Sequence, residues 1–317
     1  MILTVTANPA LDVTYELDHL RRGQVHRVAA VSERPGGKGI NVGRVLHQLG
    51  EQVTVTGLSG GPSGAILRAA LERAGVVSDL LDLLPDVRRT LVVHEDEGVT
   101  TSLWEPGRAP VDPPAAADSL VRHVDALLAE ADALVVSGSL PPGIEPMLPA
   151  RLAAVASAAK VPVIVDADGA ALQAVAAEGG AVLMPNVDEL ARLVEHSPSS
   201  RDEALQAARE LLPPVGRVPA VVLTFGEEGM AVVRPERTLL ARPPERIRGN
   251  PTGAGDAACA AVARKLAAAR SLDAVDWRDL LADAVALSAA AVLRPVAGEV
   301  DLAAYRRWRH DVIVEEA

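Results

Sequence analysis

The sequence predicts an α/β fold with a mostly parallel central sheet, and three observations support this prediction. Short apolar runs alternate with segments rich in Ala and Leu along most of the 317 residues. The apolar runs are continuous rather than interrupted by polar residues, which is typical of strands covered on both faces. Strand and helix patterns also follow one another in turn, an order that builds βαβ units and parallel strands.

Six segments fit the pattern of a buried strand, because each is a Val-, Ile-, Leu- or Ala-rich run that leads into a polar or glycine-rich stretch. The predicted strands are Ile2–Thr6, Gln52–Gly57, Ala133–Ser137, Val161–Asp166, Ala181–Met184 and Ala220–Thr224. In parallel sheets ligands bind beyond the carboxyl ends of the strands. Polar residues that directly follow these runs are therefore the candidates for a functional site.

The segments between and after the strands have helical patterns. The predicted helices are Ile40–Leu49, Gly64–Ala74, Ala115–Ala131, Met147–Ala159, Ala170–Glu178, Asp188–Glu195, Ser200–Leu212, Ala257–Ala269, Trp277–Leu293 and Asp301–Arg309. The sequence contains neither an internal repeat nor a linker-like stretch. We therefore expect residues 1–317 to form a single domain.

Two segments differ from this regular order. Residues 13–34 and 89–104 contain shorter and more polar alternating patterns, and neither lies between a parallel strand and its helix. Both leave the main sheet near strand ends. We expect them to pair as a small second sheet that covers the ligand cleft as a lid; the alternative is a surface hairpin without a function.

The composition argues against several classes of function. A net charge of −11 disfavours nucleic acid as a partner, because such proteins present a basic face. The one cysteine, Cys259, excludes an intrachain disulfide, and the seven histidines lack the spacing of a zinc site. No run reaches the roughly 18 apolar residues of a membrane span, and no signal peptide pattern is present. We expect a cytoplasmic protein without membrane contact.

The most informative motif is Gly253-Ala254-Gly255-Asp256, which follows Asn250-Pro251-Thr252 and precedes an apolar helix. Glycines permit a tight turn, and a helix N-terminus attracts anions through its free N–H groups and partial positive charge. Asp256 in such a turn is a candidate base for phosphoryl transfer to a hydroxyl. The alternative is an ordinary helix start with an acid in its first turn.

Two further motifs follow the first strand. Gly36, Gly37, Lys38 and Asn41 open a helix and combine flexible backbone, one cation and a helix N-terminus, a pattern that indicates anion binding. The spacing matches neither a Walker A loop nor a dinucleotide fingerprint. Asp12 lies after Pro9, which ends the strand, and could accept hydrogen bonds from vicinal sugar hydroxyls or simply cap a turn.

Three motifs lie at later strand ends. Ser139 is expected to hydrogen-bond a ligand, since its surroundings are not those of a nucleophile elbow. Asn186 and Glu189, three residues apart at a helix start, could hold a hydrated Mg²⁺ or could only cap the helix. The glycine turn after Thr224 could approach a nucleotide, or form a plain hairpin.

The order of these motifs resembles that of the PfkB (ribokinase-like) carbohydrate kinases over essentially the whole chain. The stretches NPALD, PGGKGINV, RVLHQLG and SGSLPPG are most similar to the branch of 1-phosphofructokinase and tagatose-6-phosphate kinase. The resemblance implies a ribokinase-like three-layer α/β/α sandwich with a mostly parallel central sheet and a small β-sheet lid. It also implies ATP and Mg²⁺ as cofactors, a sugar phosphate as acceptor and a homodimer formed through the lid.

The resemblance further implies a role for each motif. Asp256 would be the base, and the transferring phosphoryl group would be stabilised by the amides of Gly253, Ala254 and Gly255. The sugar would be held by Asp12, Gly36, Gly37, Lys38, Asn41 and Ser139, with Arg89 of the lid on its phosphate. The donor side would consist of Asn186, Glu189 (to Mg²⁺ through water), Thr224, Gly226, Gly229 and Asn250.

The sequence departs from the family pattern in four places. Arg88-Arg89-Thr90-Leu91 stands in place of the usual Thr-Arg-x-Asn of the lid, and Trp104 stands where Asn usually precedes Glu-Pro-Gly. Met184 replaces a Lys that commonly precedes Pro-Asn, and the last turn reads Asn-Pro-Thr-Gly rather than Asn-Ser-Val-Gly. The motif of the reaction is intact, so these changes bear on the acceptor.

We therefore expect an ATP-dependent kinase of a ketohexose phosphate, such as fructose 1-phosphate or tagatose or fructose 6-phosphate. Two cations, Lys38 and Arg89, favour this acceptor over an unphosphorylated sugar or a nucleoside, which is the first alternative. A non-catalytic sensor of a sugar or nucleotide is the alternative of another class, which the intact Gly253–Asp256 motif disfavours. A dehydrogenase is weaker still, since no G-x-G-x-x-G follows the first strand.

Overall fold

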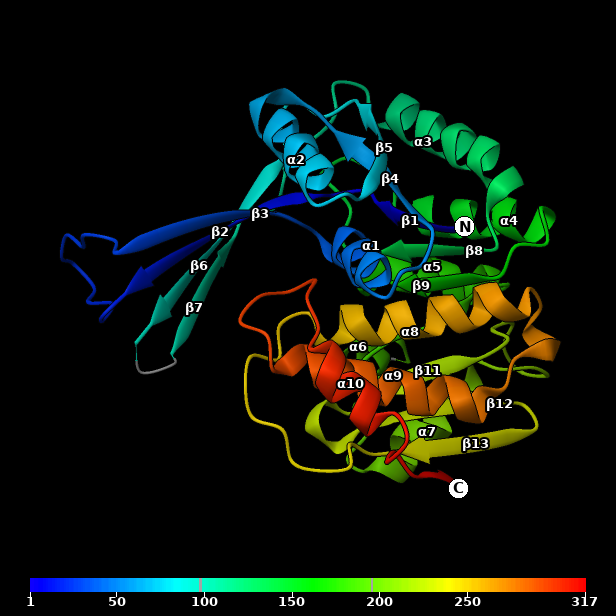
Figure 1. The fold of residues 1–317 in the computed structure, drawn as a ribbon. Helices are drawn as coiled ribbons and strands as arrows, with labels where there is room; N and C mark the ends of the chain where they lie inside the picture. The colour runs from blue at the N-terminus through cyan, green and yellow to red at the C-terminus, as the bar shows by residue number, and fades with distance from the viewer. Residues whose placement is uncertain (97–98, 195) are drawn as a thin grey trace.

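The computed structural model describes residues 1–96, 99–194 and 196–317, and in these residues the chain forms two sheets. The larger sheet has the strand order β14-β13-β12-β11-β10-β9-β8-β1-β4-β5 (Figure 1). Its strands are β1 (Ile2–Thr6), β4 (Val53–Ser59), β5 (Val77–Asp82), β8 (Ala133–Ser137), β9 (Val163–Asp166), β10 (Val182–Leu183), β11 (Val221–Thr224), β12 (Met230–Arg234), β13 (Arg237–Ala241) and β14 (Val314–Glu316). The strands from β11 to β5 in this order are parallel, and β12, β13 and β14 extend the sheet antiparallel.

All six predicted strands of the main sheet are present, as are the ten predicted helices. The helices are α1 (Lys38–Gln48), α2 (Gly61–Arg73), α3 (Pro113–Leu127), α4 (Leu148–Ala158), α5 (Gly169–Glu178), α6 (Val187–Leu193), α7 (Arg201–Glu210), α8 (Ala254–Ala269), α9 (Trp277–Val292) and α10 (Leu302–Trp308). Residue 195, the predicted end of one helix, lies outside the described residues. No helix of the described part is long and apolar enough to cross a bilayer.

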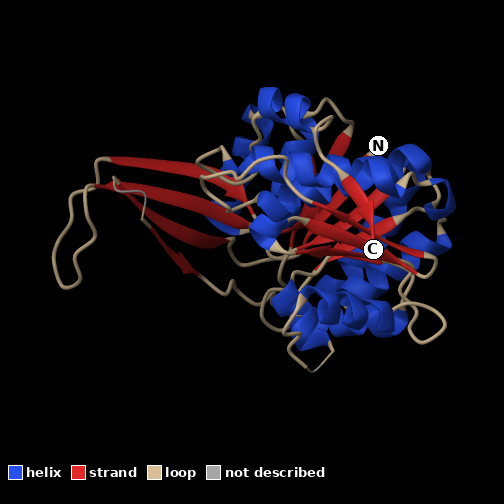
Figure 2. Ribbon diagram, turned by 90° about the horizontal axis from the view of Figure 1, so that it is seen from below, coloured by secondary structure: helices blue, strands red, loops and turns tan. Residues whose placement is uncertain are grey.

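Helices cover both faces of the main sheet, so the three-layer arrangement is confirmed (Figure 2). Successive residues of β1 enter opposite cores, because side chains of a strand alternate between its faces. Ile2 belongs to the core formed with α1, α8, α9 and α10, and Leu3 to the core formed with α3, α4, α5 and α7. Burial of both faces explains why the strands are continuous apolar runs.

Helix α1 lies very close to the sheet because two of its glycines face the strands. A Cβ atom at Gly39 would lie 2.5 Å from Thr6 Oγ1, and one at Gly43 would lie 2.5 Å from Val55 Cγ2. Any side chain at these positions would push the helix away from β1 and β4. The glycines therefore place the start of α1, with Lys38, at the carboxyl end of β1.

The smaller sheet has the order β3-β2-β6-β7 and projects from the body of the molecule (Figure 1). Its strands are β2 (Ala10–Leu17), β3 (Ala30–Gly36), β6 (Arg88–Glu95) and β7 (Thr100–Trp104). The two predicted lid segments thus pair with each other, although residues 97 and 98 of the second lie outside the described residues and the first lid strand begins at residue 10 rather than 13. Asp12 consequently lies within the lid strand β2, and not between β1 and the lid as the sequence suggested.

Candidate active site

The candidate site lies at the carboxyl ends of the parallel strands, where the lid joins the body (Figure 1). Asn8 follows β1, Ser137 ends β8, Asp166 ends β9, and Asn186 follows β10. Helix α8 packs against β8 and β9. Residues from four strand ends, the starts of α1 and α8 and the base of the lid therefore lie around one region.

Asp256 is buried in the first turn of α8, with only 6% of its surface exposed. One carboxylate oxygen, Oδ2, accepts a hydrogen bond of 2.8 Å from Nδ2 of Asn41 in α1. Burial and the nearby charge of Asp166 raise the pKa of Asp256 to about 7, although the hydrogen bond from Asn41 and the charge of Lys38 oppose the shift. A carboxyl group with a pKa near neutrality can exchange a proton at physiological pH.

The turn before Asp256 presents free backbone amides. Gly253 adopts a left-handed conformation (φ 86°) that favours glycine, and a Cβ there would also lie 2.8 Å from Ala297. In the described part of the chain the amides of Gly253 and Gly255 have no acceptor, whereas the amide of Ala254 donates to the Pro251 carbonyl at 3.1 Å. The space where a Gly255 side chain would lie is open. Of the three amides expected to bind a phosphoryl group, those of Gly253 and Gly255 are therefore free in the described part of the chain.

Lys38 connects the carboxylates of the site. Its Nζ lies 2.8 Å from Oδ1 of Asp166 and 4.0 Å from Oε1 of Glu189. Burial alone would lower the pKa of Lys38, but the charge and hydrogen bond of Asp166 and the charges of Glu189 and Asp256 together outweigh it and hold this pKa above its usual range. Ser137 Oγ donates to the other oxygen of Asp166 at 2.9 Å. Lys38 is thus already ion-paired with Asp166 and lies near Glu189 and Asp256. This weakens the prediction, made from the sequence, that Lys38 indicates a phosphate on the acceptor.

Asn186 and Glu189 adopt the capping arrangement, which is one of the two interpretations made from the sequence. Asn186 Oδ1 accepts from the Glu189 amide, and Glu189 Oε2 accepts from the Asn186 amide, each at 2.8 Å, so the pair caps α6. The other oxygen of Glu189 faces Lys38. Burial raises the pKa of Glu189. No cluster of three potential metal ligands occurs among the described residues, so Asp166 and Glu189 fit a Mg²⁺ held mainly by waters and phosphate oxygens, and not by a protein cage.

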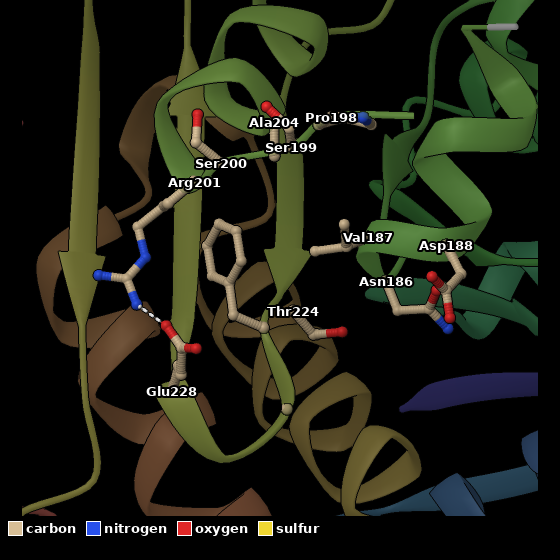
Figure 3. Close-up of a pocket in the computed structure, with 12 residues that line it drawn as sticks. Asn186, Val187, Asp188, Pro198, Ser199, Ser200, Arg201, Ala204, Thr224 and Glu228 are labelled. Atoms are coloured by element: carbon tan, nitrogen blue, oxygen red, sulfur yellow. Dashed lines mark hydrogen bonds and ion pairs between the residues drawn. The ribbon is translucent and has the colours of Figure 1, made fainter. Parts of the chain in front are cut away.

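A cavity of about 420 Å³ adjoins Asn186 and Thr224. Figure 3 shows Asn186 and Asp188 on one side of this cavity, the ion pair of Arg201 with Glu228 on the other, and Thr224 between them. The Arg201 guanidinium also lies 5.3 Å from the centre of the Phe225 ring. Gly226, whose φ is 60°, has open space where a side chain would lie. Three predicted nucleotide residues, Asn186, Thr224 and Gly226, therefore line one cavity.

Two other predicted nucleotide residues have structural contacts instead. Gly229 is buried, and a Cβ there would lie 2.1 Å from the Ala241 carbonyl, so glycine is needed for the close approach of β13. Asn250 donates to the Pro295 carbonyl and accepts from the Thr252 amide. Neither lines the cavity. Asn250 shapes the turn that carries Gly253, and Gly229 shapes the hairpin beside Thr224.

Asp12 faces the site from the lid. Its carboxylate accepts a hydrogen bond from Thr90 Oγ1, and a Cβ at Gly36 would clash with it, so glycine is required there. Burial raises the pKa of Asp12, although the hydrogen bond from Thr90 and the charges of Arg88 and Arg44 oppose this shift.

Arg34 lies directly opposite Asp12 in the lid sheet. It forms an ion pair with Glu299, which also contacts Arg44 of α1 and Arg294. Glu299 thus ties the lid strand β3 to the body.

The lid presents Arg88, and not Arg89, to the site. Residues alternate between the faces of a strand, and Thr90, which binds Asp12, shares its face with Arg88. Arg88 is partly buried and donates to the carbonyl oxygens of Asn8 and Glu105. No ion pair to Arg88 occurs within the described residues. Arg89 is exposed on the opposite face, so this protomer's Arg89 does not reach the site that the sequence assigned to it.

Ser139 lies at the rim of the site, beside Asn8. Its Oγ accepts a hydrogen bond of 3.1 Å from Asn8 Nδ2, which also donates to the carbonyl of Pro106. The hydroxyl of Ser139 is exposed and keeps its proton available for a ligand. Asn8 thus joins the end of β1 to the loops after β7 and β8.

Sequence reasoning missed Asp166, Arg88 and Thr90. An acid at the end of a buried strand was a usable signal for Asp166, because polar residues there face ligands. Arg88 and Thr90 lacked such a signal, since the face of a lid strand depends on its pairing register.

Comparison with known proteins gives concordant matches. The model of the pfkB family of carbohydrate kinases matches residues 6–302, a span that contains every predicted site residue. A 1-phosphofructokinase of Xanthomonas campestris pv. campestris is 36% identical over 269 residues, which cover 83% of each protein.

Solved structures show the same similarity. Phosphofructokinase-2 from Escherichia coli, in its tetrameric inhibited form, has a TM-score of 0.88 at 28% identity over 98% of both chains. Ribokinase from Arabidopsis thaliana, complexed with ribose and ATP, has a TM-score of 0.72 at 20% identity, covering 97% of this chain and 98% of that chain. The second comparison concerns the fold alone.

Proposed function

This chain belongs to the pfkB family of carbohydrate kinases, and from this premise we propose that it transfers the γ-phosphoryl group of ATP to a hydroxyl of a ketohexose phosphate. Family membership confirms the predicted class of enzyme, a phosphotransferase that acts on a sugar hydroxyl. One observation carries the proposal: a buried carboxylate, Asp256, lies in the first turn of a helix beside free amides and within hydrogen-bond distance of Asn41.

In the proposed reaction the acceptor hydroxyl attacks the γ-phosphorus, the bond from phosphorus to the leaving oxygen of ADP breaks, and Asp256 takes the hydroxyl proton. The transition state of such transfers is loose, so the proton moves late and orientation of the hydroxyl matters most. Asn41 supports this role because its hydrogen bond fixes one oxygen of Asp256. The other oxygen is then left for the acceptor.

The turn before α8 is suited to the charge that develops on the transferring group. The free amides of Gly253 and Gly255 and the helix dipole attract the phosphoryl oxygens. Lys38 adds a cation between the acceptor side at Asp256 and the donor side at Glu189. When bound with ATP, Mg²⁺ would neutralise the phosphate charge, and Asp166 and Glu189 are the residues that would order its waters.

The donor is proposed to lie along the cavity at Asn186, Thr224 and Gly226. This places the nucleotide on the side of Glu189, with its terminal phosphate toward the start of α8. Met184 is buried in the core shared with α8 and α9. Because this position is a methionine, the lysine that commonly precedes Pro-Asn in the family is missing here. Lys38 is then the lysine nearest to the proposed phosphates.

The acceptor is proposed to lie between the lid and α1. Asp12 and Ser139 offer acceptors and donors for sugar hydroxyls, while Arg88 is a partly buried cation on the same face of the lid as Asp12. Within the described residues no carboxylate lies within ion-pair distance of Arg88, although the charges of Asp12 and Glu105 act on it, and such an arginine favours a ligand that carries a phosphate. Fructose 1-phosphate is the first acceptor to test, because the 36% identical relative is named 1-phosphofructokinase.

We further propose that two chains associate through the lid. On the face of the lid away from Asp12, Val31 and Leu103 are 57% and 56% exposed, although both are apolar. Exposed apolar residues on a projecting sheet are typical of an interface between chains. We place the reaction in the cytoplasm, where the donor is made.

The test is a coupled measurement of ADP release with fructose 1-phosphate, fructose 6-phosphate, tagatose 6-phosphate, free fructose and a nucleoside. We expect a ketohexose phosphate to have the highest kcat/KM. Asp256→Asn should lower kcat by about 10²–10⁴, the usual contribution of a general base. Asp311→Asn, which changes an exposed acid near the C-terminus, is the matched control and should leave kcat unchanged.

Two outcomes would count against the proposal. A higher kcat/KM for free fructose or the nucleoside would favour the alternative acceptor on the same fold. Absence of ADP release with every sugar, in protein that binds ATP, would favour the sensor. Near wild-type turnover of Asp256→Asn would remove this residue from its proposed role.

A further inference from the structure

One row of side chains crosses all four strands of the lid on the face that carries Asp12. In this row Arg34 lies directly opposite Asp12, Asp12 opposite Thr90, and Thr90 opposite Trp104. Residues directly opposite each other on neighbouring strands point to the same face of a sheet. The hydrogen bond between Thr90 and Asp12 supports this assignment. Trp104 therefore shares the face that covers the active site.

Trp104 is unlike the other two tryptophans of the chain. Trp277 and Trp308 are each 4% exposed; an arginine lies over each ring, and Trp308 Nε1 donates to Glu245. Trp104 is 72% exposed, and its side chain makes no hydrogen bond or cation–π contact within the described residues. An indole in water is costly, because burying its large apolar surface would be favourable. Its exposed indole is therefore available to a ligand that lies against this face of the lid.

We propose that Trp104 is a specificity-determining residue that packs its indole ring against the C–H groups of the acceptor sugar. This inference rests on the proposed function, because it assigns one contact within the proposed acceptor site. The faces of ring-form sugars carry C–H groups that fit an aromatic surface, while the hydroxyls at the ring edge remain free for Asp12. The residue thus selects for a cyclic sugar rather than for a phosphate.

The dimensions of the lid permit this contact. Neighbouring strands lie about 4.8 Å apart, so Trp104, two strands from Asp12, begins about 10 Å away from it. An indole that turns back over Thr90 covers much of that span, and a sugar ring fills the rest. Arg88 lies on the same face, two residues before Thr90. A sugar phosphate between these groups meets a carboxylate, a cation and an aromatic surface together.

The intrinsic fluorescence of the protein gives a direct test, because the exposed tryptophan should dominate any change at the lid. We expect fructose 1-phosphate, or the best acceptor of the screen, to shift the emission of the wild-type protein to shorter wavelength without ATP. Trp104→Phe should lose this shift, since the two remaining tryptophans are buried. The shift should saturate with acceptor concentration and not depend on protein concentration.

Steady-state kinetics provide the second readout. Trp104→Ala should raise KM for the acceptor about three- to tenfold, the range expected for loss of one aromatic contact. Trp104→Phe should recover part of this loss, and KM for ATP should stay constant in both variants. Ile313→Ala removes a similarly exposed apolar side chain, 73% exposed near the C-terminus, and should leave both constants unchanged.

The proposal and the proposed function can fail separately. An emission shift that depends on protein concentration and not on sugar would place Trp104 in a contact between chains and overturn the proposal. An unchanged acceptor KM in Trp104→Ala would also overturn it while the kinase activity stands. A fluorescence response to sugar phosphate without any ADP release would instead contradict the kinase reaction and support the sugar contact.

Discussion

At the scale of single residues, the site combines two buried carboxylates, which repel each other, with one lysine that partly compensates their charge. Asp256 and Asp166 are both buried near each other, and their repulsion contributes to the raised pKa of Asp256. Lys38 compensates them by its ion pair with Asp166. Such a cluster costs stability but sets a base near neutral pH, a trade typical of catalytic groups.

The pKa of Asp256 predicts how activity depends on pH. A base must be unprotonated, so kcat/KM should fall about tenfold per pH unit below about 7 and level off above it. Lys38→Met removes a charge that lowers this pKa, so the acidic limb should move to higher pH. Profiles of kcat/KM between pH 5 and 9 for both proteins would check this. A Lys38→Met limb that moves to lower pH would contradict the assignment.

At the scale of elements, the face of one lid strand decides which arginine lies on the side of the proposed acceptor. The family pattern pointed to Arg89, because motifs are matched by position and not by the direction of a side chain. The structure pairs β6 with β2 so that Thr90 binds Asp12, which places Arg88 on the site face. A shift of one residue reverses the face of every side chain in a strand.

This arrangement predicts a difference between two neighbouring substitutions. Arg88→Ala should raise KM for the phosphorylated acceptor about 10- to 100-fold, as expected for loss of a charge-assisted contact worth about 1.5–3 kcal/mol. Arg89→Ala should have a clearly smaller effect if each site is completed by its own lid. Kinetics with the phosphorylated and the free sugar would separate the two. An Arg89→Ala effect that equals or exceeds that of Arg88→Ala would show that the exposed arginine reaches a phosphate, in this subunit or its partner.

Elements buried on both faces were predictable, and elements at the edges were not. The inner strands are mainly apolar because two helix layers cover them, and the threonines Thr4, Thr6 and Thr56 within them are buried as well. Edge strand β5 has the sequence VSDLLD and β14 has VEE, which mix charged residues into half-exposed positions. Asp166 is a similar case within the site. The strand that it ends was predicted, but its part in the site follows only from its contacts with Lys38 and Ser137, which come from distant parts of the chain.

At the scale of the whole molecule, the small second sheet and the three-layer body are both present, and on the face of the lid away from Asp12 the edge residues Val31 and Leu103 are exposed, whereas Val13 and Val93 of the central strands are buried. Val31 lies on β3 and Leu103 on β7, at opposite edges of the lid. A second copy of the lid is an occupant of matching size and chemistry. Helix layers cover the main sheet, whereas the lid sheet extends away from the body (Figure 1).

Association through the lid predicts sensitivity to charge on this face. Leu103→Asp should convert a dimer into a monomer at micromolar concentration, because a carboxylate buried at such an interface would be costly. Light scattering coupled to size exclusion would measure the mass of the wild-type and variant proteins. Ile313→Asp, which adds a charge at another exposed apolar position, is the control. A wild-type monomer, or a Leu103→Asp dimer, would exclude this mode of association.

The hydrogen bond between Asn41 and Asp256 joins residues that are 215 positions apart, and the contact of Arg34 with Glu299 joins residues 265 positions apart. During synthesis the proposed sugar-binding residues of the first half therefore leave the ribosome long before Asp256, the proposed base. Contacts between distant residues form slowly, because a long loop must close first. A growing chain thus contains the proposed acceptor residues before it contains Asp256. Phosphoryl transfer can begin only after the last third of the chain has folded onto the first third.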